Sequence, residues 1–430
     1  MRKKSRRQNG GIGEFLRKTF LSLHTRNFRL FFIGQTISNT GNWLTRIAVT
    51  LLVLRLTHGS GLAIGFLAAS QFGPVFFLSI WAGAIADRHD KRQLLLITQS
   101  LEMAQSIGLA IVAFQPHPPL LAIYLLAVLG GGVLAFDNPL RQSFVVEMVP
   151  ESDIPNAVVL YSTIVNLSRS FGPALAGVLV VTLGYGWAFT LDAISYVVVI
   201  GCLVIMRTAE LHREAPRPRS GREIREGLRY VLSEPTLWVT LTMFVIVTAL
   251  AYEFRVSLPL FVTKALKSRD IVFTVFYSVF SAGAVVCALL VARRNRVTFR
   301  QVITGAAAFG VSLFILSIAP GVVVAGVVVF FVGAASILYM NASTAIIQTR
   351  TRRDMQARVL SLRTMILGGS AAAGGPFLGW IADLAGTRML MVIGGIACLL
   401  AAIFGYCASR YYQITESATD DATEDLSYPR

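Results

Sequence analysis

Several charged residues lie within long apolar stretches of this 430-residue chain, and five of them are candidates for proton transfer. Three are carboxylates and two are arginines, namely Glu102, Asp192, Glu253, Arg46 and Arg169. Charged side chains inside apolar helices are costly, so they indicate function by default. A carboxyl group can carry a proton if burial raises its pKa at one stage and a cation or water lowers it at another. The three carboxylates are therefore candidate proton carriers, although ion pairs that only support the structure would explain the same residues.

Other chemistries lack the residues they require. The four cysteines lie in apolar stretches at no ligand-like spacing, which indicates neither a disulfide framework nor a metal site. The chain contains no Gly-x-x-x-x-Gly-Lys-Ser/Thr sequence, so direct use of ATP is disfavoured and an ion gradient is the remaining energy source. No His/Asp cluster or Ser/His/Asp set lies near one end of the apolar segments. We therefore expect neither an enzyme nor a bound cofactor.

The composition is that of a membrane protein. Apolar residues make up 54% of the chain, the mean hydropathy is +0.64, and only 14% of residues are charged, against about a quarter in soluble domains. The net charge of +16 could indicate a nucleic-acid partner. However, the Lys and Arg residues occur in short bursts between apolar blocks instead of on one soluble face. This pattern favours orientation in a lipid bilayer and no binding of nucleic acid.

Twelve blocks are long enough to cross a bilayer, which takes about 20 mostly apolar residues in a helix. They are 28–54, 62–85, 93–115, 119–138, 156–183, 187–206, 237–262, 270–292, 299–319, 321–345, 357–382 and 388–408. With a cytoplasmic N-terminus, 27 of the 39 Lys and Arg residues fall in the cytoplasmic segments, four fall in the outer segments and eight lie within the ranges of the spans. The positive-inside tendency therefore predicts an all-α integral membrane protein of twelve transmembrane helices with both termini inside.

The chain divides into two halves. The predicted parts are a basic cytoplasmic N-terminus (1–27), a six-helix bundle (28–207), a cytoplasmic interdomain loop (208–235), a second six-helix bundle (236–410) and an acidic, disordered tail (411–430). Within the loop, apolar residues from Ile224 to Leu232 recur at helical spacing opposite charged ones, which predicts a helix lying on the membrane surface or a solvated helix. The sequence Phe171–Gly177 returns as Gly374–Gly379, and the prolines of the two copies are 203 positions apart.

The segment from Gly83 to Arg92 resembles the Gly-x-x-x-Asp-Arg-x-Gly-Arg-Arg signature of the major facilitator superfamily, with Asp90 in place of the second glycine. The resemblance implies two parallel six-helix bundles with the transport path between them. It also implies a cytoplasmic latch that closes in the outward-open state. The predicted latch residues are Gly83, Asp87, Arg88, Lys91, Arg92, Asp137 and Arg141. A charged turn that only sets the topology is the alternative.

Four further segments resemble the exporter branch that contains the enterobactin exporter and macrolide efflux proteins. They are 136–142, 156–177, 191–196 and 356–361. The resemblance implies proton-driven export of bulky, partly apolar molecules, such as drugs or siderophores, across a bacterial cytoplasmic membrane, and we expect a monomer. A lipid or lysophospholipid translocator of the same fold is the alternative function.

In the superfamily, spans 1, 4, 7 and 10 line the cavity. Gln35, Asn39, Asn42 and Arg46 are spaced by 4, 3 and 4 residues, so they form one polar stripe on span 1. The resemblance implies that this stripe faces the cavity, although bonding between helices would also explain it. The other predicted cavity residues are Tyr124, Tyr252, Tyr339 and Asn341. Glu253 is the first choice as proton carrier because span 7 lines the cavity, and we expect it to pair with Arg46.

The repeated sequence resembles the antiporter motif of span 5. Its residues are Gly172, Pro173 and Gly177 in the first half and Gly375, Pro376 and Gly379 in the second. Lost side-chain bulk and a missing backbone hydrogen bond allow bending and close helix contact at such positions. A packing kink without further function would produce the same sequence.

Overall fold

The computed structural model describes residues 19–212, 223–292, 297–352 and 355–414. All regular elements of this part of the chain are helices. The first half contains η1 (Leu21–His24), α2 (Arg26–Leu56), α3 (Gly61–Arg88), α4 (Lys91–Ala113), α5 (Leu120–Glu147), η2 (Glu151–Asp153), α6 (Ile154–Leu183), α7 (Tyr185–Ile205) and η3 (Thr208–Glu210). The second half contains α8 (Glu223–Ser233), α9 (Pro235–Leu250), α10 (Phe254–Leu260), η4 (Phe261–Ala265), α11 (Asp270–Ala292), α12 (Phe299–Ser317), α13 (Val322–Arg350), α14 (Gln356–Ala385) and α15 (Thr387–Tyr411). Most of the predicted N-terminal and C-terminal segments lie outside the described residues.

Eleven helical segments of the described chain are long and apolar enough to cross a membrane. One of them, Pro235–Ala265, combines α9, α10 and η4. Helix α2 is not among the eleven, although its 31 residues extend over about 46 Å. Its polar side chains lower its mean hydropathy. The count of twelve spans and the cytoplasmic position of the termini remain predictions.

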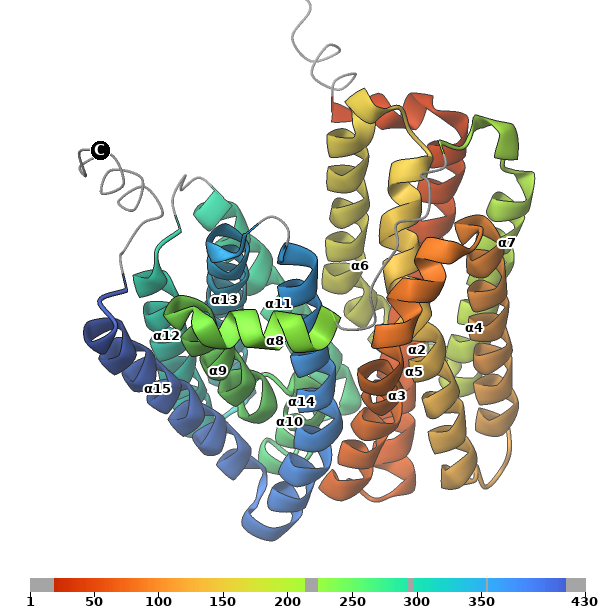
Figure 1. Ribbon diagram of the computed structural model, residues 1–430. Coiled ribbons are helices and arrows are strands. Elements are labelled where there is room, and N and C mark those ends of the chain that lie inside the picture. The colour runs from red at the N-terminus through yellow and green to blue at the C-terminus, as the bar shows by residue number, and fades with distance from the viewer. Residues whose placement is uncertain (1–18, 213–222, 293–296, 353–354, 415–430) are drawn as a thin grey trace, which may run out of the picture.

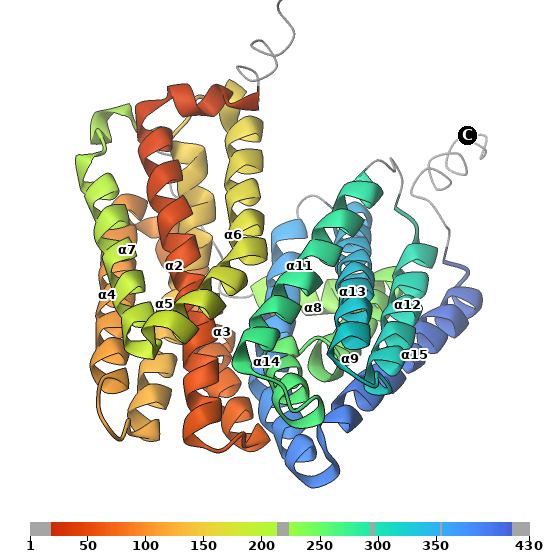
Figure 2. The same ribbon diagram turned by 180° about the vertical axis from the view of Figure 1, so that it is seen from behind.

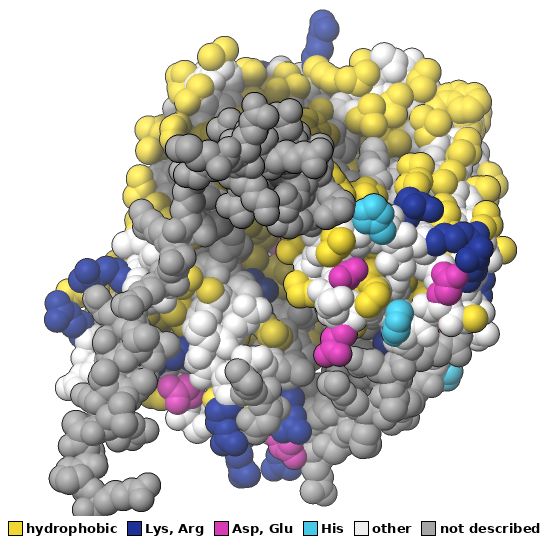
Figure 3. Space-filling model, turned by 90° about the horizontal axis from the view of Figure 1, so that it is seen from above, with side chains coloured by type: hydrophobic (Ala, Val, Ile, Leu, Met, Phe, Trp, Pro, Cys, Tyr) yellow, Lys and Arg dark blue, Asp and Glu magenta, His cyan; other side chains and the backbone are white. Residues whose placement is uncertain are grey.

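The helices form two bundles that lie side by side (Figures 1 and 2). Helices α2 to α7 make one bundle, and α9 to α15 make the other. The bundles converge at the end where α3 begins and α14 ends, and they separate toward the end from which the chain termini emerge. Large apolar side chains such as Trp187 of α7 and Ile403 of α15 are exposed, as expected for contact with lipid. Seen from the side of the termini, Lys and Arg side chains lie at several places along this end of the molecule (Figure 3).

The two halves touch most closely along the antiparallel pair α3 and α14. Gly61 and Gly65 of α3 lie against Gly379 and Gly375 of α14, so that backbone meets backbone. A Cβ atom on Gly65 would lie 2.6 Å from the Cα of Pro376, a distance that real Cβ atoms do not show. Larger residues at these positions would therefore force the two halves apart.

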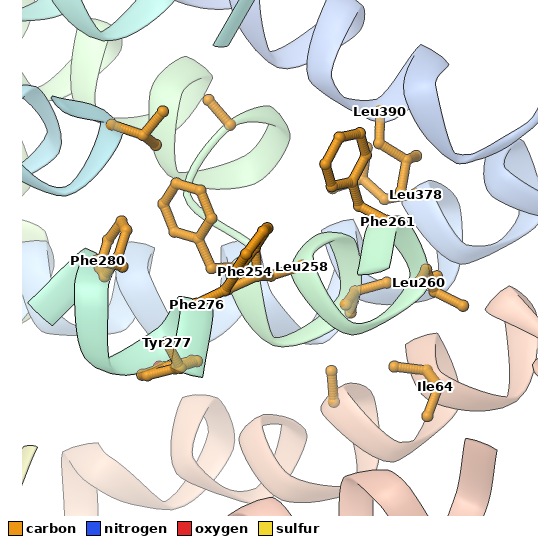
Figure 4. Packing of buried hydrophobic residues seen from close by; sticks show 14 of the residues in the cluster. Ile64, Phe254, Leu258, Leu260, Phe261, Phe276, Tyr277, Phe280, Leu378 and Leu390 are labelled. Carbon is orange, nitrogen blue, oxygen red and sulfur yellow. The ribbon is translucent and has the colours of Figure 1, made fainter. Parts of the chain in front are cut away.

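An apolar cluster fills the rest of the junction (Figure 4). The rings of Phe254 in α10 and Phe280 in α11 have centroids 4.6 Å apart. Phe261 lies close to Leu378 and Leu390, which belong to α14 and α15. All of these side chains are buried, so this end of the molecule is closed by close-packed apolar groups.

Polar contacts also bridge the halves at the closed end. The carboxylate of Asp383 in α14 accepts hydrogen bonds from the backbone N–H groups of Gly61 (2.8 Å) and Leu62 (2.9 Å), the first residues of α3. It also accepts one from the Ser60 hydroxyl (3.2 Å) and pairs with the Lys264 ammonium at 2.9 Å. The negative charge thus lies at the positive N-terminus of a helix in the other half. We name these contacts the Asp383 lock.

The predicted span at 237–262 is not one continuous helix. Helix α9 ends at Leu250, the chain turns through residues 251–253, and α10 begins at Phe254. Glu253 is the residue that precedes α10, and a short π-helical segment, η4, follows. The rise of about 1.5 Å per residue that holds in a continuous helix therefore does not extend from α9 across the turn to Glu253.

Helix α8 lies across α9 and α14 within the polar interruption between the halves (Figure 1). Its Glu226 carboxylate pairs with Arg358 of α14 at 2.7 Å, and Val231 is buried beneath it. Leu228 and Leu232 remain exposed. Exposed leucines on a charged helix are typical of a helix at a membrane surface, which is one of the two predicted alternatives.

Candidate functional site

The largest cavity described has a volume of about 620 Å³ and lies within the first bundle at its junction with the second. Three helices, α2, α5 and α6, provide its wall. The lining residues are Asn39, Asn42, Trp43, Arg46, Leu134, Asp137, Asn138, Arg141, Gln142, Val145, Val158, Tyr161, Ser162, Val165, Asn166 and Arg169. The wall therefore combines aromatic rings, amides and guanidinium groups with aliphatic side chains.

A smaller cavity of about 80 Å³ adjoins the first one. The two share Asn42, Trp43, Arg46 and Leu134 in their walls. Side chains from both halves line it, including Glu102 and Asp192 from the first half and Arg255 from the second. The smaller of the two adjoining cavities is thus the one that lies between the halves.

Arg141 of α5 lies at the centre of a buried polar network. Its guanidinium pairs with Asp137, one turn earlier, and with Glu102 of α4 at 3.3 Å. It also donates to the Gln35 side-chain oxygen at 2.8 Å. Gln99 donates to Asp137 at 2.8 Å. One cation thus faces two carboxylates, and buried charges of this kind are tolerated only when they are paired and hydrogen-bonded.

Asp192 of α7 is held by hydroxyl groups. It accepts hydrogen bonds from Thr45 (2.6 Å), Ser106 (2.8 Å) and Ser195 (3.4 Å), and the carboxylate is almost completely buried. Three donors from three helices fix this group and hold α2, α4 and α7 together. The role is compatible with support of the structure, which was one of the two expectations for this residue.

Glu253 differs from the other two carboxylates. Its side chain is only 6% exposed, and its carboxyl group has no hydrogen bond or ion pair to any residue that the structure describes. The expected pair with Arg46 is not present. Arg46 donates to the side chain of Asn42 at 2.5 Å and lies over the ring of Trp43. The broken helix brings Arg255 toward the smaller cavity instead, where its guanidinium lies 4.2 Å from the centre of the Phe72 ring.

Two members of the predicted span 1 stripe, Asn39 and Asn42, lie in the wall of the larger cavity. Gln35 lies behind the wall and is completely covered. Tyr252 is half-buried outside the two cavity walls and accepts a hydrogen bond from Arg169 at 3.2 Å.

Three other predicted cavity residues line neither cavity. Tyr339 is completely buried in the second bundle, where it packs against Gly305 of α12. Tyr124 donates to the backbone carbonyl of Ala63 at 3.0 Å, so its hydroxyl ties α5 to α3. Asn341 is exposed. Tyrosine is amphipathic, so its presence in a cavity helix does not distinguish a cavity side chain from one that packs between helices.

The described latch residues bind within their own half. The Lys91 ammonium pairs with Glu147 of α5 at 2.6 Å. Arg92 donates to the backbone carbonyls of Leu203 (2.7 Å) and Val204 (3.1 Å) in α7. Asp90 accepts from the backbone N–H of Arg92 at 2.9 Å and so caps α4, which explains how the signature tolerates its replacement of glycine.

The remaining latch residues divide into two groups. Asp137 and Arg141 belong to the buried network already described. Gly83, Asp87 and Arg88 lie at the end of α3, and their side chains are outside the described part. The basic segment of the second half at 293–296 is outside it as well.

The antiporter-like glycines lie at close contacts. Gly172 faces Trp43, and a Cβ atom on Gly177 would lie 2.6 Å from the Cβ of Thr274 in α11, across the junction between the halves. Gly375 and Gly379 belong to the contact between α14 and α3. Pro173 and Pro376 lie inside helices that continue past them.

Sequence reasoning missed the contribution of α6 to the cavity. Tyr161, Asn166 and Arg169 of this helix line the larger cavity, as does Trp43 of α2. The polar residues of α6 recur at helical spacing, and this signal could have identified the face. The prediction instead assigned cavity residues by analogy to spans 1, 4, 7 and 10.

A family model described as "transmembrane secretion effector" matches residues 18–427. The chain belongs to this family of major facilitator transporters. It is 25% identical to the staphyloferrin A transporter of Staphylococcus aureus (strain NCTC 8325 / PS 47) over 392 residues, which cover 89% of this chain and 96% of that protein. It is 26% identical to the enterobactin exporter EntS of Shigella flexneri over 236 residues, which cover 54% of this chain and 57% of that one. The relatives are transporters, so this is a multi-pass membrane transporter of a small molecule.

Solved structures share the fold. A bacterial homologue of the human lysosomal transporter Spinster, in an inward-facing and unoccupied conformation, superposes with a TM-score of 0.70 at 15% identity, covering 89% of this chain and 97% of that one. A POT family transporter in complex with 5-aminolevulinic acid gives a TM-score of 0.73 at 12% identity, covering 90% and 96% of the two chains. At this identity the likeness shows the fold alone, and the fold is that of the major facilitator superfamily.

Proposed function

We propose that this transporter exports a siderophore-class molecule across the bacterial cytoplasmic membrane in exchange for protons, by alternating access. The observation that carries the proposal is the cavity of about 620 Å³ beside the junction of the two bundles. This volume lies within the range of about 300–1,000 Å³ that is typical of sites for drug-sized ligands. The names of two relatives, a staphyloferrin A transporter and an enterobactin exporter, favour a siderophore over other bulky compounds.

The open end of the structure fits one stage of such a cycle. The halves are closed by the Asp383 lock and the apolar cluster, and they separate where the termini emerge. If the termini are cytoplasmic, as the distribution of Lys and Arg predicts, this is the state that loads substrate from inside. Export then requires the lock to open and the end near Lys91 and Arg92 to close, with Asp87 as part of the latch.

Glu253 is our candidate for the proton carrier. Glu102 is neutralised by Arg141, and Asp192 is held by three hydroxyl groups. Glu253 is 6% exposed and forms no hydrogen bond or ion pair with the described residues, although Arg255, two residues further along, acts on it electrostatically. Burying an ionised carboxylate without a partner costs much free energy, whereas burying the protonated carboxyl group costs far less. Such a group therefore favours binding a proton. Glu253 also lies at the turn between α9 and α10, where a change in the helix break would alter its surroundings.

An efflux assay tests the function. Cells that express the transporter would be loaded with a panel of fluorescent dyes, antibiotics, iron-free catecholate and citrate-based siderophores, and labelled lysolipid, with and without a protonophore. We expect efflux of the siderophore-class probes that stops when the protonophore is added. Efflux of lysolipid alone, unaffected by the protonophore, would support the lipid translocator and contradict the proposal.

A further inference from the structure

Cations outnumber carboxylates in the wall of the larger cavity. Three guanidinium groups face it, from Arg46, Arg141 and Arg169, against the single carboxylate of Asp137. The charge of Arg141 is balanced, because the Asp137 and Glu102 carboxylates pair with its guanidinium group. Arg46 and Arg169 have no carboxylate partner among the residues that the structure describes. Neither arginine therefore forms an ion pair with the described residues, although Glu102 and Asp192 act on Arg46 electrostatically.

The polar contacts of these two arginines leave most of their donors available. Arg46 donates to the Asn42 side chain at 2.5 Å, and Arg169 donates to the Tyr252 hydroxyl at 3.2 Å. A guanidinium group has five N–H donors arranged for bidentate contact with a carboxylate. Both side chains are partly covered, so an unpaired charge at these positions is more costly than one on the surface.

The surrounding charges do not supply the missing partner. The smaller cavity also contains Arg46, and there Glu102 and Asp192 face Arg255 as a further cation. Glu102 is bound to Arg141, and Asp192 accepts from hydroxyl groups. The walls of the two cavities together still contain four arginines and three carboxylates. A ligand that brought acidic groups would balance this charge.

We infer that Arg46 and Arg169 recognise an acidic part of the transported molecule, which therefore carries at least one ionised acid, such as a carboxylate, to balance the one cation in excess. The inference rests on the proposed function and specifies the substrate class of the same cavity. Trp43 and Tyr161 lie in the same wall and offer flat surfaces to the apolar part of such a molecule. Arg169 also contacts Tyr252 of the second half, so an acid bound there lies beside a contact that must change when the halves move.

The test compares two fluorescent probes of nearly the same shape. N-dansyl-aspartate carries two carboxylates, and N-dansyl-asparagine amide carries none. Binding to the purified full-length protein in nanodiscs would be measured at pH 7.5 by fluorescence titration. We expect the wild type to bind the dianion at least tenfold more tightly than the neutral amide.

Variants then locate the preference. Arg46→Gln and Arg169→Gln should each weaken binding of the dianion at least tenfold and change binding of the amide less than twofold. The matched control is Arg207→Gln, which removes an exposed arginine that pairs with Glu210 and should leave both affinities unchanged. Arg→Lys at either cavity position should restore part of the loss, because the charge returns without the bidentate geometry.

Equal affinity of the wild type for the two probes would overturn the inference, and this result does not depend on whether a variant folds. A dianion preference that survives in both glutamine variants would overturn it as well. The result of this binding experiment is independent of the result of the efflux assay. A protein that prefers the dianion but exports no siderophore would contradict the proposed function and leave the recognition site in place.

Discussion

The Asp383 lock gives a quantitative prediction about the balance between the two conformations. Asp383→Asn removes the charge that faces the N-terminus of α3 and the ammonium of Lys264, but keeps an oxygen that can accept a hydrogen bond. Asp383→Ala also leaves the N–H groups of Gly61 and Leu62 without this acceptor. The contacts of Asp383 with Ser60, Gly61 and Leu62 join the two halves and exist only in the conformation in which this end is closed. We therefore expect both substitutions to increase the population in which it is open.

The magnitude follows from the contacts. Lys264 and Asp383 have side chains that are 37% and 31% exposed, so solvent limits their ion pair to about 1 kcal/mol or less. The charge at the helix N-terminus contributes about 0.3–1 kcal/mol. Because Lys264 and Asp383 belong to the same half, only the charge at the helix N-terminus acts between the halves, so Asp383→Asn should shift the equilibrium by about 0.3–1 kcal/mol, roughly a 2- to 5-fold change in the population ratio. Asp383→Ala should add about 1 kcal/mol, because donors are left unpaired.

Distances between spin labels provide the assay. Labels at His58→Cys and Leu384→Cys, which are exposed positions beside α3 and within α14, would report the separation of the halves in nanodiscs. The native cysteines would first be replaced. Lys264→Met removes an ion pair within the second half and should leave the long-distance population nearly unchanged, whereas Asp383→Asn should increase it and Asp383→Ala should increase it further. Glu210→Gln, remote from the lock, is the charge control. A distance distribution in Asp383→Ala that equals that of the wild type would refute the reasoning.

Three further predictions concern other parts of the molecule. Arg141→Gln leaves two buried carboxylates without their cation and should lower the free energy of unfolding by about 3–5 kcal/mol. The Tm in detergent should therefore fall, and it should partly recover in the double variant Arg141→Gln/Asp137→Asn. An unchanged Tm in Arg141→Gln would rule out this network as a source of stability. Asp87→Asn should reduce transport while leaving the protein in the membrane, and equal transport at equal expression would remove Asp87 from the mechanism. A cysteine at Ser220 should not react with an impermeant thiol reagent outside intact cells, because the interdomain loop is predicted to be cytoplasmic; labelling there would overturn the topology.

Much of the helical architecture could be predicted because its cause is local. Long apolar blocks must form helices in a bilayer, and eleven such helical segments are present in the described chain. The turn before Glu253 could not be predicted in this way. Its flanking segments are as apolar as a continuous helix, and the turn depends on packing, since Gly394 of α15 lies directly against Ala251.

The site was harder to predict because cavity walls depend on how helices rotate and cross. The spacing of Asn39 and Asn42 identified one wall, since both lie on one face of α2. Tyr339 is buried within the second bundle. Analogy identifies a helix but not the side of it that faces a cavity. Arg169 was expected to assist proton coupling, and its place in the cavity wall became visible only when α2, α5 and α6 were brought together.

The central claim is that export is coupled to protons through Glu253. In inverted membrane vesicles the lumen corresponds to the outside of the cell, so acidifying the lumen should drive a siderophore probe identified by the efflux panel into it. We expect the wild type to accumulate the probe when the lumen is acidified and to lose it when the pH gradient is dissipated. Glu253→Gln should bind the probe as the wild type does and show no response to the gradient. Accumulation by the wild type that is indifferent to the gradient would contradict the coupling, and an undiminished response in Glu253→Gln would contradict the role of this residue.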